Sequence, residues 1–271
     1  MKYYQEYFSM SNGIKIQKVG FGTWQMQDLE ILGETISECF RLGLNHIDSA
    51  WDYQNESLIK QVLAKTNKKR SEYFVTSKLP SHIKGYDITL EYFNKSLTNF
   101  GFEYLDLYLI HAPWPWDDIG RDCTAGNIES WKAMIKLYQQ KKIRSIGVSN
   151  FSITDLEAII KATGFIPHVN QIRFFVGCYD KELVDYCHEK GILIEAYSPL
   201  GTGKVFDDII IKQMADKYQV TVAQLCMKYC LQHDTLPIFK TNTISRIKEN
   251  IDLEFEISKS DMDFLDTLKE E

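Results

Sequence analysis

The sequence predicts an α/β fold in which eight strands and their helices close into one (β/α)8 barrel, the TIM barrel. Short apolar runs, rich in β-branched and aromatic residues, alternate with helical segments along the chain without a linker. Runs of this kind are typical of parallel strands that are buried on both faces. Polar residues end or follow three of these runs, and the active sites of such barrels lie at that end of the strands.

The first expected element is a hairpin, because Asn12-Gly13 supplies the positive φ values of a tight turn. The barrel strands follow it. Each is a short run of mostly apolar residues, as a strand buried on both faces requires. They are expected at residues 19–24, 46–50, 73–78, 105–111, 143–150, 168–174, 192–198 and 236–241.

Helices are expected between the strands, and their periodicity and end signals define them. Trp131, Met134 and Tyr138 recur at the spacing of one helical face. Ser152 is the expected N-cap of the helix after the fifth barrel strand, and Gly191 ends the helix after the sixth. The expected helices cover residues 29–42, 55–66, 88–100, 128–142, a segment after 152, 181–190, two helices within 206–232, 243–253 and a terminal helix from 258. Extra helices therefore follow the seventh strand and the eighth.

Length and composition indicate one domain, residues 1–271, because barrels of roughly 250 residues fold as single units. The hydrophobic fraction of 44% is sufficient for a full core, and the net charge of −6 includes no broad basic field. This distribution argues against nucleic acid as a partner. No run has the apolar stretch of a signal peptide or a membrane span. We therefore expect a cytosolic protein that does not bind membranes.

The sequence does not indicate disulfides or a metal site. The six cysteines are dispersed through a well-filled chain, and we expect them to be reduced. Cys226 and Cys230 share a helical face, but no nearby pattern supplies two further metal ligands. No Gly-x-Gly-x-x-Gly motif follows the first strand, so a Rossmann fold is not indicated. Residues 201–204 resemble part of a phosphate loop but lack the Walker A spacing.

Four residues with acid–base chemistry lie at or just after the ends of three consecutive expected strands. They are Asp48, Tyr53, Lys78 and His111. In one parallel barrel these side chains converge at the C-terminal mouth. Each residue alone is commonly structural, as part of an ion pair, a rim aromatic or a strand-end histidine. Their joint position favours a catalytic interpretation.

Eight short motifs occur in a fixed order between Gly20 and Asn250. They are Gly20-Phe21-Gly22-Thr23-Trp24, Ile47-Asp48-Ser49-Ala50 with Tyr53-Gln54-Asn55-Glu56, Ser77-Lys78, Ile110-His111, Gly147-Val148-Ser149-Asn150-Phe151, Val169-Asn170-Gln171, Ala196-Tyr197-Ser198-Pro199-Leu200-Gly201 and Lys240-Thr241 with Arg246-Ile247-Lys248-Glu249-Asn250. Together these motifs resemble the aldo-keto reductase superfamily.

The resemblance implies reduction of aldehydes and ketones by NAD(P)H on the same barrel. It implies that Tyr53 is the general acid, Lys78 acidifies it, Asp48 keeps Lys78 charged, and His111 donates an orienting hydrogen bond. The chemistry suits these residue types. A phenol has a pKa of about 10, and a neighbouring ammonium should pull that value down. No metal is required.

The same resemblance implies a cofactor site, and NADPH is expected rather than NADH. Ser149, Asn150 and Gln171 would bind the nicotinamide carboxamide, and Tyr197 would stack beneath the ring. Lys240, Thr241 and Arg246 would meet the 2′-phosphate. The remaining cofactor contacts would be Glu249 and Asn250 at the adenine, Ser198, Pro199, Leu200 and Gly201 at the pyrophosphate, and Gly22, Thr23 and Trp24.

The substrate is expected to be a small carbonyl compound, and departures from the family pattern concern its pocket. Asp52 replaces what is often an apolar wall residue, so acidic substrates should be repelled. Ala112 and Pro80 stand where many members carry aromatic residues. Arg173 follows Gln171-Ile172 where a glutamate is common. The expected substrate residues are Trp24, Asp52, His111 and Trp114, and Trp51 and Trp116 are available as further aromatic lining. We expect a monomer, and the sequence leaves an oligomer open.

Two other functions stay open on the sequence alone. A Schiff-base enzyme could use Lys78 as nucleophile, because strand-end lysines of barrels attack carbonyls when their pKa is depressed. Asp48 argues against this function because it would keep the amine charged. A nicotinamide-binding regulatory subunit would retain the fold with little turnover.

Overall fold

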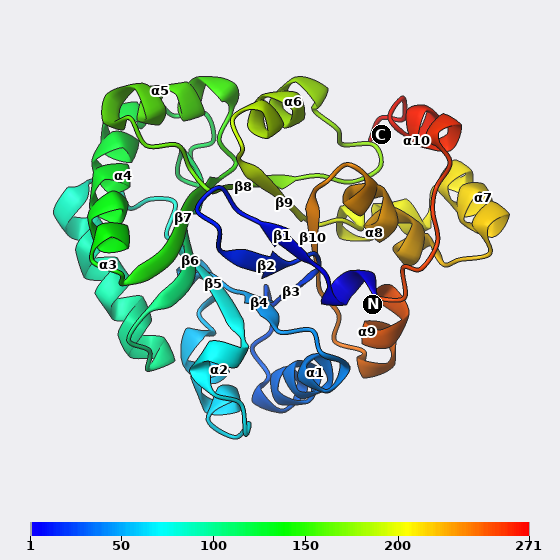
Figure 1. The fold of residues 1–271 in the computed structure, drawn as a ribbon, viewed down its shortest axis with the longest axis horizontal. Helices are drawn as coiled ribbons and strands as arrows, with labels where there is room; N and C mark the ends of the chain where they lie inside the picture. Colours follow the sequence, from blue (N-terminus) through cyan, green and yellow to red (C-terminus); the bar gives the residue numbers. More distant parts are fainter. Residues whose placement is uncertain (1, 271) are drawn as a thin grey trace.

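The computed structural model describes residues 2–270, and a closed barrel of eight parallel strands forms the centre of this part of the chain (Figure 1). Around the barrel the strands follow in the order β10-β3-β4-β5-β6-β7-β8-β9. The predicted (β/α)8 barrel is thereby confirmed. The strands are β3 (Gly20–Gly22), β4 (His46–Asp48), β5 (Phe74–Leu79), β6 (Leu105–Ile110), β7 (Ile143–Ser149), β8 (Val169–Arg173), β9 (Leu193–Tyr197) and β10 (Leu236–Phe239).

Helices surround the barrel, and Figure 1 shows α7 and α10 outside the main ring. They are α1 (Leu29–Leu42), α2 (Glu56–Leu63), α3 (Tyr86–Phe100), α4 (Thr124–Gln139), α5 (Ile153–Thr163), α6 (Lys181–Glu189), α7 (Ile209–Tyr218), α8 (Val222–Gln232), α9 (Ile244–Asn250) and α10 (Lys259–Leu265). Short 3-10 helices are η1 (Tyr3–Gln5), η2 (Trp51–Tyr53), η3 (Arg70–Glu72) and η4 (Gly201–Phe206).

The predicted helix ends are correct where a capping residue defines them. Ser152 accepts a hydrogen bond from the backbone N–H of Asp155, and both residues complete a capping box at the start of α5. Gly191 follows α6 with a φ of 69°, a left-handed conformation that glycine adopts without strain.

Several helices differ from the predicted ranges, since apolar periodicity does not mark their ends: α3 begins two residues early, α9 ends at Asn250 instead of 253, and α2 and α4 differ most clearly. Helix α2 ends at Leu63, because Lys65 and Thr66 bond three residues back and the last turn tightens. Helix α4 begins at Thr124, four residues before its apolar pattern. A Cβ at Gly126 would lie 2.6 Å from the Cβ of Lys84, so this first turn packs closely against the loop between β5 and α3.

The N-terminal hairpin closes one end of the barrel. Strands β1 (Tyr7–Ser9) and β2 (Lys15–Gln17) pair antiparallel, as the sequence predicted. Met10 and Ile16 pack with barrel residues that include Leu107, Leu109 and Leu236. Figure 1 shows the hairpin in front of the barrel's centre. The opposite end, where the strands have their carboxyl termini, is the end left for a site.

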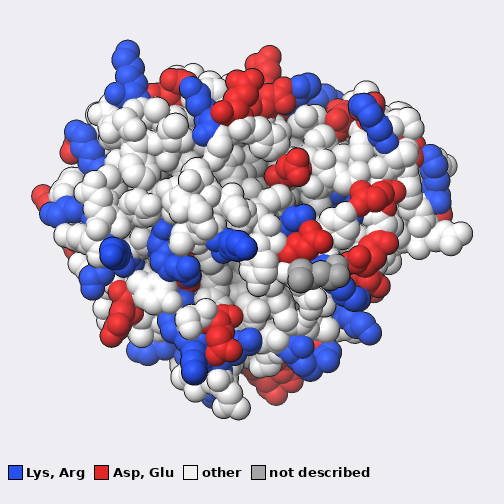
Figure 2. Space-filling model, viewed as in Figure 1, with Lys and Arg blue, Asp and Glu red and all other residues white. Residues whose placement is uncertain are grey.

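The main core lies between the barrel and its helices, where Trp131 of α4 and Tyr108 of β6 are fully buried. All six cysteines are free, and burial raises the pKa of the Cys226 thiol to about 12. Within residues 2–270, no helix combines the length and the hydropathy needed to span a membrane. On the hairpin face, basic and acidic residues are interspersed (Figure 2).

Candidate active site

The barrel brings the four predicted catalytic residues together from three neighbouring strands. Asp48 is the last residue of β4, and Lys78 lies one residue before the end of β5. His111 directly follows β6, and Tyr53 ends the short helix η2 after β4. Because β4 pairs with β5 and β5 with β6 in parallel register, their carboxyl ends meet at one mouth.

Lys78 is the centre of this cluster and is fully buried. Its Nζ atom lies 2.7 Å from Asp48 Oδ1, 2.9 Å from the carbonyl oxygen of Ser49 and 3.4 Å from the Tyr53 hydroxyl. Burial acts to lower the pKa of the ammonium, but the negative charge of Asp48, with a further contribution from Tyr53, outweighs burial and the pKa is raised. Lys78 is therefore a fixed positive charge directed at the phenol.

The phenol of Tyr53 responds to two opposing effects. Burial raises its pKa, and the Lys78 ammonium counters part of this rise. Lys78 lowers the pKa of Tyr53, as predicted, but burial has the larger effect and the pKa stays above its ordinary value. Tyr53 is thus protonated at neutral pH, which is the state that a proton donor requires.

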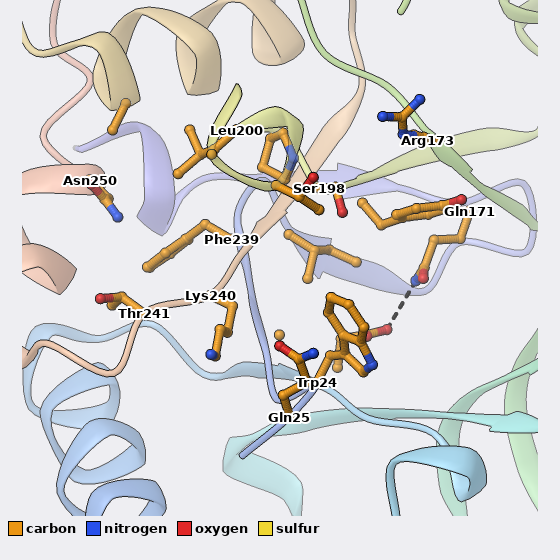
Figure 3. A pocket seen from close by; sticks show the side chains of 18 of the residues that line it. Trp24, Gln25, Gln171, Arg173, Ser198, Leu200, Phe239, Lys240, Thr241 and Asn250 are labelled. Atoms are coloured by element: carbon orange, nitrogen blue, oxygen red, sulfur yellow. Dashed lines mark hydrogen bonds between the residues drawn. The ribbon is translucent and has the colours of Figure 1, made fainter. Parts of the chain in front are cut away.

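A second buried layer lies beneath Asp48. The Nε2 atom of Gln171 donates to Asp48 Oδ2 at 2.9 Å, the bond drawn in Figure 3, and to Glu195 Oε2 at 2.7 Å. Burial, followed by the charge of Asp48, raises the pKa of Glu195 to about 8. Glu195 was not predicted from the sequence, although a glutamate inside an otherwise apolar strand was a signal for it.

The histidine of the cluster has an acidic neighbour. His111 Nδ1 lies 3.2 Å from Asp52 Oδ2, and the His111 ring packs edge-on against Tyr53 and Trp116. Burial lowers the pKa of His111. Asp52 is therefore bound to the imidazole and does not simply face the solvent.

An elongated cavity of about 1000 Å³ opens at this cluster. Tyr53, His111 and Trp116 line it near the barrel mouth, and it extends to α9. Figure 3 shows Gln171 and Arg173 at one side, Thr241 and Asn250 at the other, and Phe239 and Lys240 between them. Such a cavity suits a long ligand that has one end at the catalytic cluster.

Most of the predicted cofactor and substrate residues line the cavity. They are Gly22, Trp24, Asp52, His111, Ser149, Asn150, Gln171, Tyr197, Ser198, Pro199, Leu200, Lys240, Thr241, Arg246, Glu249 and Asn250. Residues that the sequence analysis did not assign also line it. These are Gln25, Arg173, Thr202, Gly203, Phe206, Thr221, Ala223, Ile238 and Phe239.

Several predicted residues lie outside the lining, among them the fully buried Lys78. Thr23 is buried and donates through Oγ1 to the carbonyl oxygen of Asp48 at 2.9 Å. Gly201 lies behind the cavity wall, where an added Cβ would meet the ring of Phe175 at 2.9 Å. Of the further tryptophans expected at the pocket, Trp116 lines the cavity. Trp114 packs against Trp116 with ring centroids 4.9 Å apart, and Trp51 packs against Tyr92, so neither lines it.

The strand ends near the cluster hold two non-glycine residues in the left-handed conformation, Asn150 with φ 60° and Ser198 with φ 51°. This backbone conformation costs free energy in residues other than glycine, and such residues are common at functional sites. Tyr197 donates its hydroxyl to Asn150 Oδ1 at 2.8 Å, and Asn150 Nδ2 donates to the carbonyl oxygen of His111 at 3.1 Å. This network fixes the amide groups at the mouth.

Comparison with known proteins gives the family. The chain matches the Aldo/keto reductase family over residues 18–270. It is similar to a glyoxal reductase of Bacillus subtilis, with 38% identity over 97% of this chain and 92% of that protein. A 9,11-endoperoxide prostaglandin H2 reductase of Trypanosoma cruzi shares 32% identity over 97% of this chain and 91% of that protein.

Solved structures show the same likeness. An aldo/keto reductase of Brucella melitensis superposes with a TM-score of 0.87 at 34% identity, covering 96% of this chain and 98% of that one. An aldo-keto reductase of Bombyx mori, solved in complex with NADP, gives a TM-score of 0.86 at 28% identity, covering 96% and 91%. The fold and the relatives define an oxidoreductase. This chain belongs to the aldo/keto reductase family, which confirms the resemblance seen in its motifs.

Proposed function

We propose that this protein reduces the carbonyl group of a small aldehyde or ketone with NADPH, and that Tyr53 is the general acid. The position of Tyr53 carries the proposal. Its hydroxyl lies 3.4 Å from the Lys78 ammonium, and Tyr53 lines the cavity. A carbonyl that accepts hydride builds negative charge on its oxygen, and a positioned proton donor stabilises that charge.

Each residue of the cluster then has one role. Tyr53 gives its proton to the carbonyl oxygen, and Lys78 stabilises the phenolate that remains. Asp48 keeps Lys78 charged and oriented through the 2.7 Å bond. Protonated His111 donates a hydrogen bond to the same carbonyl oxygen. General acid catalysis of this kind typically contributes ~10²–10⁴-fold in rate.

The hydrogen-bonding side chains that line the cavity suit a nicotinamide dinucleotide phosphate. NADPH, when bound, would supply the hydride. Ser149, Asn150 and Gln171 would hold the carboxamide, with Tyr197 beneath the ring. Because Gln171 Nε2 already donates hydrogen bonds to Asp48 and Glu195, the Oε1 atom of Gln171 would accept a hydrogen bond from the carboxamide.

The other end of the cavity carries the charges that a phosphate needs. Lys240 and Arg246 line it there, and Arg246 forms no ion pair with any residue between 2 and 270. We assign these two cations and Thr241 to the 2′-phosphate, and Glu249 and Asn250 to the adenine. A charge-assisted contact to this phosphate favours NADPH over NADH.

We propose that the substrate is a small, uncharged aldehyde, with a dicarbonyl such as glyoxal as the first candidate. The Bacillus subtilis glyoxal reductase at 38% identity supports this class. Asp52 adds a negative charge to the pocket, which disfavours acidic substrates. Trp24 and Trp116, which are 50% and 43% exposed, offer apolar walls at the mouth.

The two alternative functions are less well supported. Attack by Lys78 on a carbonyl needs a neutral amine, whereas Asp48 and Tyr53 raise the pKa of Lys78. A regulatory subunit would need no proton donor, whereas here a protonated phenol lies at the cavity.

A spectrophotometric screen of NADPH oxidation tests the proposal. Purified protein is assayed with glyoxal, other uncharged aldehydes and ketones, and Tyr53→Phe is the matched variant. Oxidation that depends on both substrate and Tyr53 supports the proposed function. NADPH binding by fluorescence without oxidation of any substrate would instead favour the regulatory subunit, and trapping of substrate on Lys78 by borohydride would favour the Schiff base.

A further inference from the structure

His111 and Asp52 form a hydrogen-bonded pair at the mouth of the cavity. The distance from His111 Nδ1 to Asp52 Oδ2 is 3.2 Å, and both residues line the cavity. Their side chains are 8% and 27% exposed. Asp52 directly precedes Tyr53 in η2, so the turn that carries the proton donor also places this carboxyl group.

The hydrogen bond determines which ring nitrogen carries a proton. Burial opposes ionisation of Asp52, but its hydrogen bond to His111 and the charge of that ring outweigh burial, and the pKa of Asp52 is lowered. Asp52 is therefore a carboxylate at neutral pH. Because a carboxylate only accepts hydrogen bonds, the proton between the two groups lies on His111 Nδ1.

This assignment limits what the other nitrogen can do. A neutral imidazole has one N–H, so Nε2 then has a lone pair. In the described part of the chain, Nε2 makes no hydrogen bond, and it is the nitrogen left for a ligand in the cavity. A lone pair cannot donate to a carbonyl oxygen. Only the imidazolium has an N–H on both nitrogens, one for Asp52 and one for the substrate.

Charged groups on several elements act on His111. Burial lowers its pKa and Lys78 of β5 adds to that effect, whereas Asp52 of η2 and Asp48 of β4 raise the pKa. His82, in the loop after β5, acts on Asp52 and lowers the pKa of that carboxyl. The balance leaves the pKa of His111 below its ordinary value.

We propose that Asp52 is a positioning residue that fixes the Nδ1–H form of His111, so that His111 donates to the substrate oxygen only when it is protonated. The inference rests on the proposed reductase function. Asp52 does not touch the reacting atoms. It acts through His111 and makes the strength of one oxyanion contact depend on pH.

The substitution Asp52→Asn separates the tautomer from the size of the side chain. Asparagine is isosteric with aspartate, and its amide can either accept from Nδ1–H or donate to an Nδ1 lone pair. The neutral ring is then free to carry its proton on Nε2 and to donate at any pH. Valine has no hydrogen-bonding group, so in Asp52→Val the neutral ring can likewise carry its proton on Nε2.

The first test observes the tautomer without cofactor or turnover. Protein labelled with ¹⁵N-histidine is studied by NMR at about pH 8, and loss of one signal in His111→Gln assigns the ring. We expect only Nδ1–H in the native protein and a detectable Nε2–H form in Asp52→Asn or Asp52→Val. An Nε2–H form in the native protein, or one tautomer shared by all three proteins, overturns the proposal.

The second test is the pH profile of kcat/KM for an uncharged aldehyde between about pH 5 and pH 8. In the native protein kcat/KM should fall by up to ~10-fold per pH unit above the pKa of His111, while Asp52→Asn stays nearly flat. At the upper end the variant should be faster, by as much as ~10²-fold, the usual effect of one oxyanion donor. Parallel profiles would overturn the proposal. Absence of reduction by every protein would instead refute the reductase function, and the NMR result still decides the tautomer.

Discussion

Glu195 and the catalytic Asp48 share one amide donor, since Gln171 Nε2 lies 2.7 Å from Glu195 Oε2 and 2.9 Å from Asp48 Oδ2. Two charged carboxylates in this buried place would repel each other. The ion pair with Lys78 holds the charge on Asp48. Glu195 therefore keeps its proton, and burial together with Asp48 raises its pKa to about 8.

This arrangement predicts how stability depends on pH. A carboxyl whose pKa is raised on folding stabilises the protein below the unfolded pKa, and this stabilisation is lost as the pH rises toward about 8. Glu195→Gln cannot ionise. The free energy of unfolding of Glu195→Gln should therefore increase relative to that of the native protein as the pH rises from about 5 to 8. The increase should be at most ~1.4 kcal/mol per pH unit.

Urea unfolding at several pH values measures this difference. Glu189→Gln is the matched control, because Glu189 is an exposed residue of α6. The same pH dependence in both variants would show that Glu195 is not the titrating group.

Tyr53→Phe should abolish most carbonyl reduction and leave NADPH binding nearly unchanged, because only the proton donor is lost. Steady-state rates and fluorescence titration with NADPH measure the two effects. Tyr186→Phe is a control on the outer surface, where the Tyr186 hydroxyl donates to Glu157. Near-normal turnover of Tyr53→Phe would remove Tyr53 from its proposed role.

Arg246→Ala should weaken NADPH binding by roughly tenfold or more, and NADH binding much less, because only NADPH carries the 2′-phosphate. Hydrogen bonds to charged groups contribute about 1.5–3 kcal/mol. Arg246 is exposed at the rim of the cavity, so the lower end of this range applies.

The control for this measurement is Lys248→Ala, an exposed cation of the same helix that does not line the cavity. Dissociation constants for both cofactors are compared in the two variants. Equal losses of NADPH and NADH in Arg246→Ala would place Arg246 outside the phosphate site.

The catalytic cluster could be predicted from the sequence, because a general rule of parallel barrels determines where such residues lie. Residues at the ends of adjacent parallel strands meet at one mouth, so Asp48, Lys78 and His111 follow from the strand assignment alone. The fold was predictable for the same reason, since strand and helix periodicities are local. Exact ends were not, as α4 shows by starting four residues before its apolar pattern.

Contacts that depend on loop conformation could not be predicted from the sequence. Trp114 and Trp116 are separated by one residue, and only the loop decides which of them faces the cavity. Arg173 pairs with Glu270 at 2.6 Å across 97 residues, and no local pattern relates the two. The bond between Asp52 and His111 likewise depends on η2, whose final turn leaves Gln54 at a φ of 55°.

Asp52 should also discriminate against acidic substrates. With neutral His111 the pair carries one negative charge in a partly buried pocket, where a second carboxylate is costly. Asp52→Val should therefore raise the ratio of kcat/KM for a carboxylated aldehyde to that of its uncharged analogue. In the native protein the same ratio should rise as the pH falls and His111 becomes protonated, because the pair is then neutral.

Measurement of both substrates at two pH values separates charge from shape. Asp52→Asn keeps the shape and removes the charge, so it should raise the ratio at about pH 8 as much as Asp52→Val does. A ratio that rises only in Asp52→Val would assign the selectivity to pocket size. A ratio that is unchanged in both variants would mean that Asp52 does not contribute to selectivity, and the aromatic walls at Trp24 and Trp116 would be the next residues to vary.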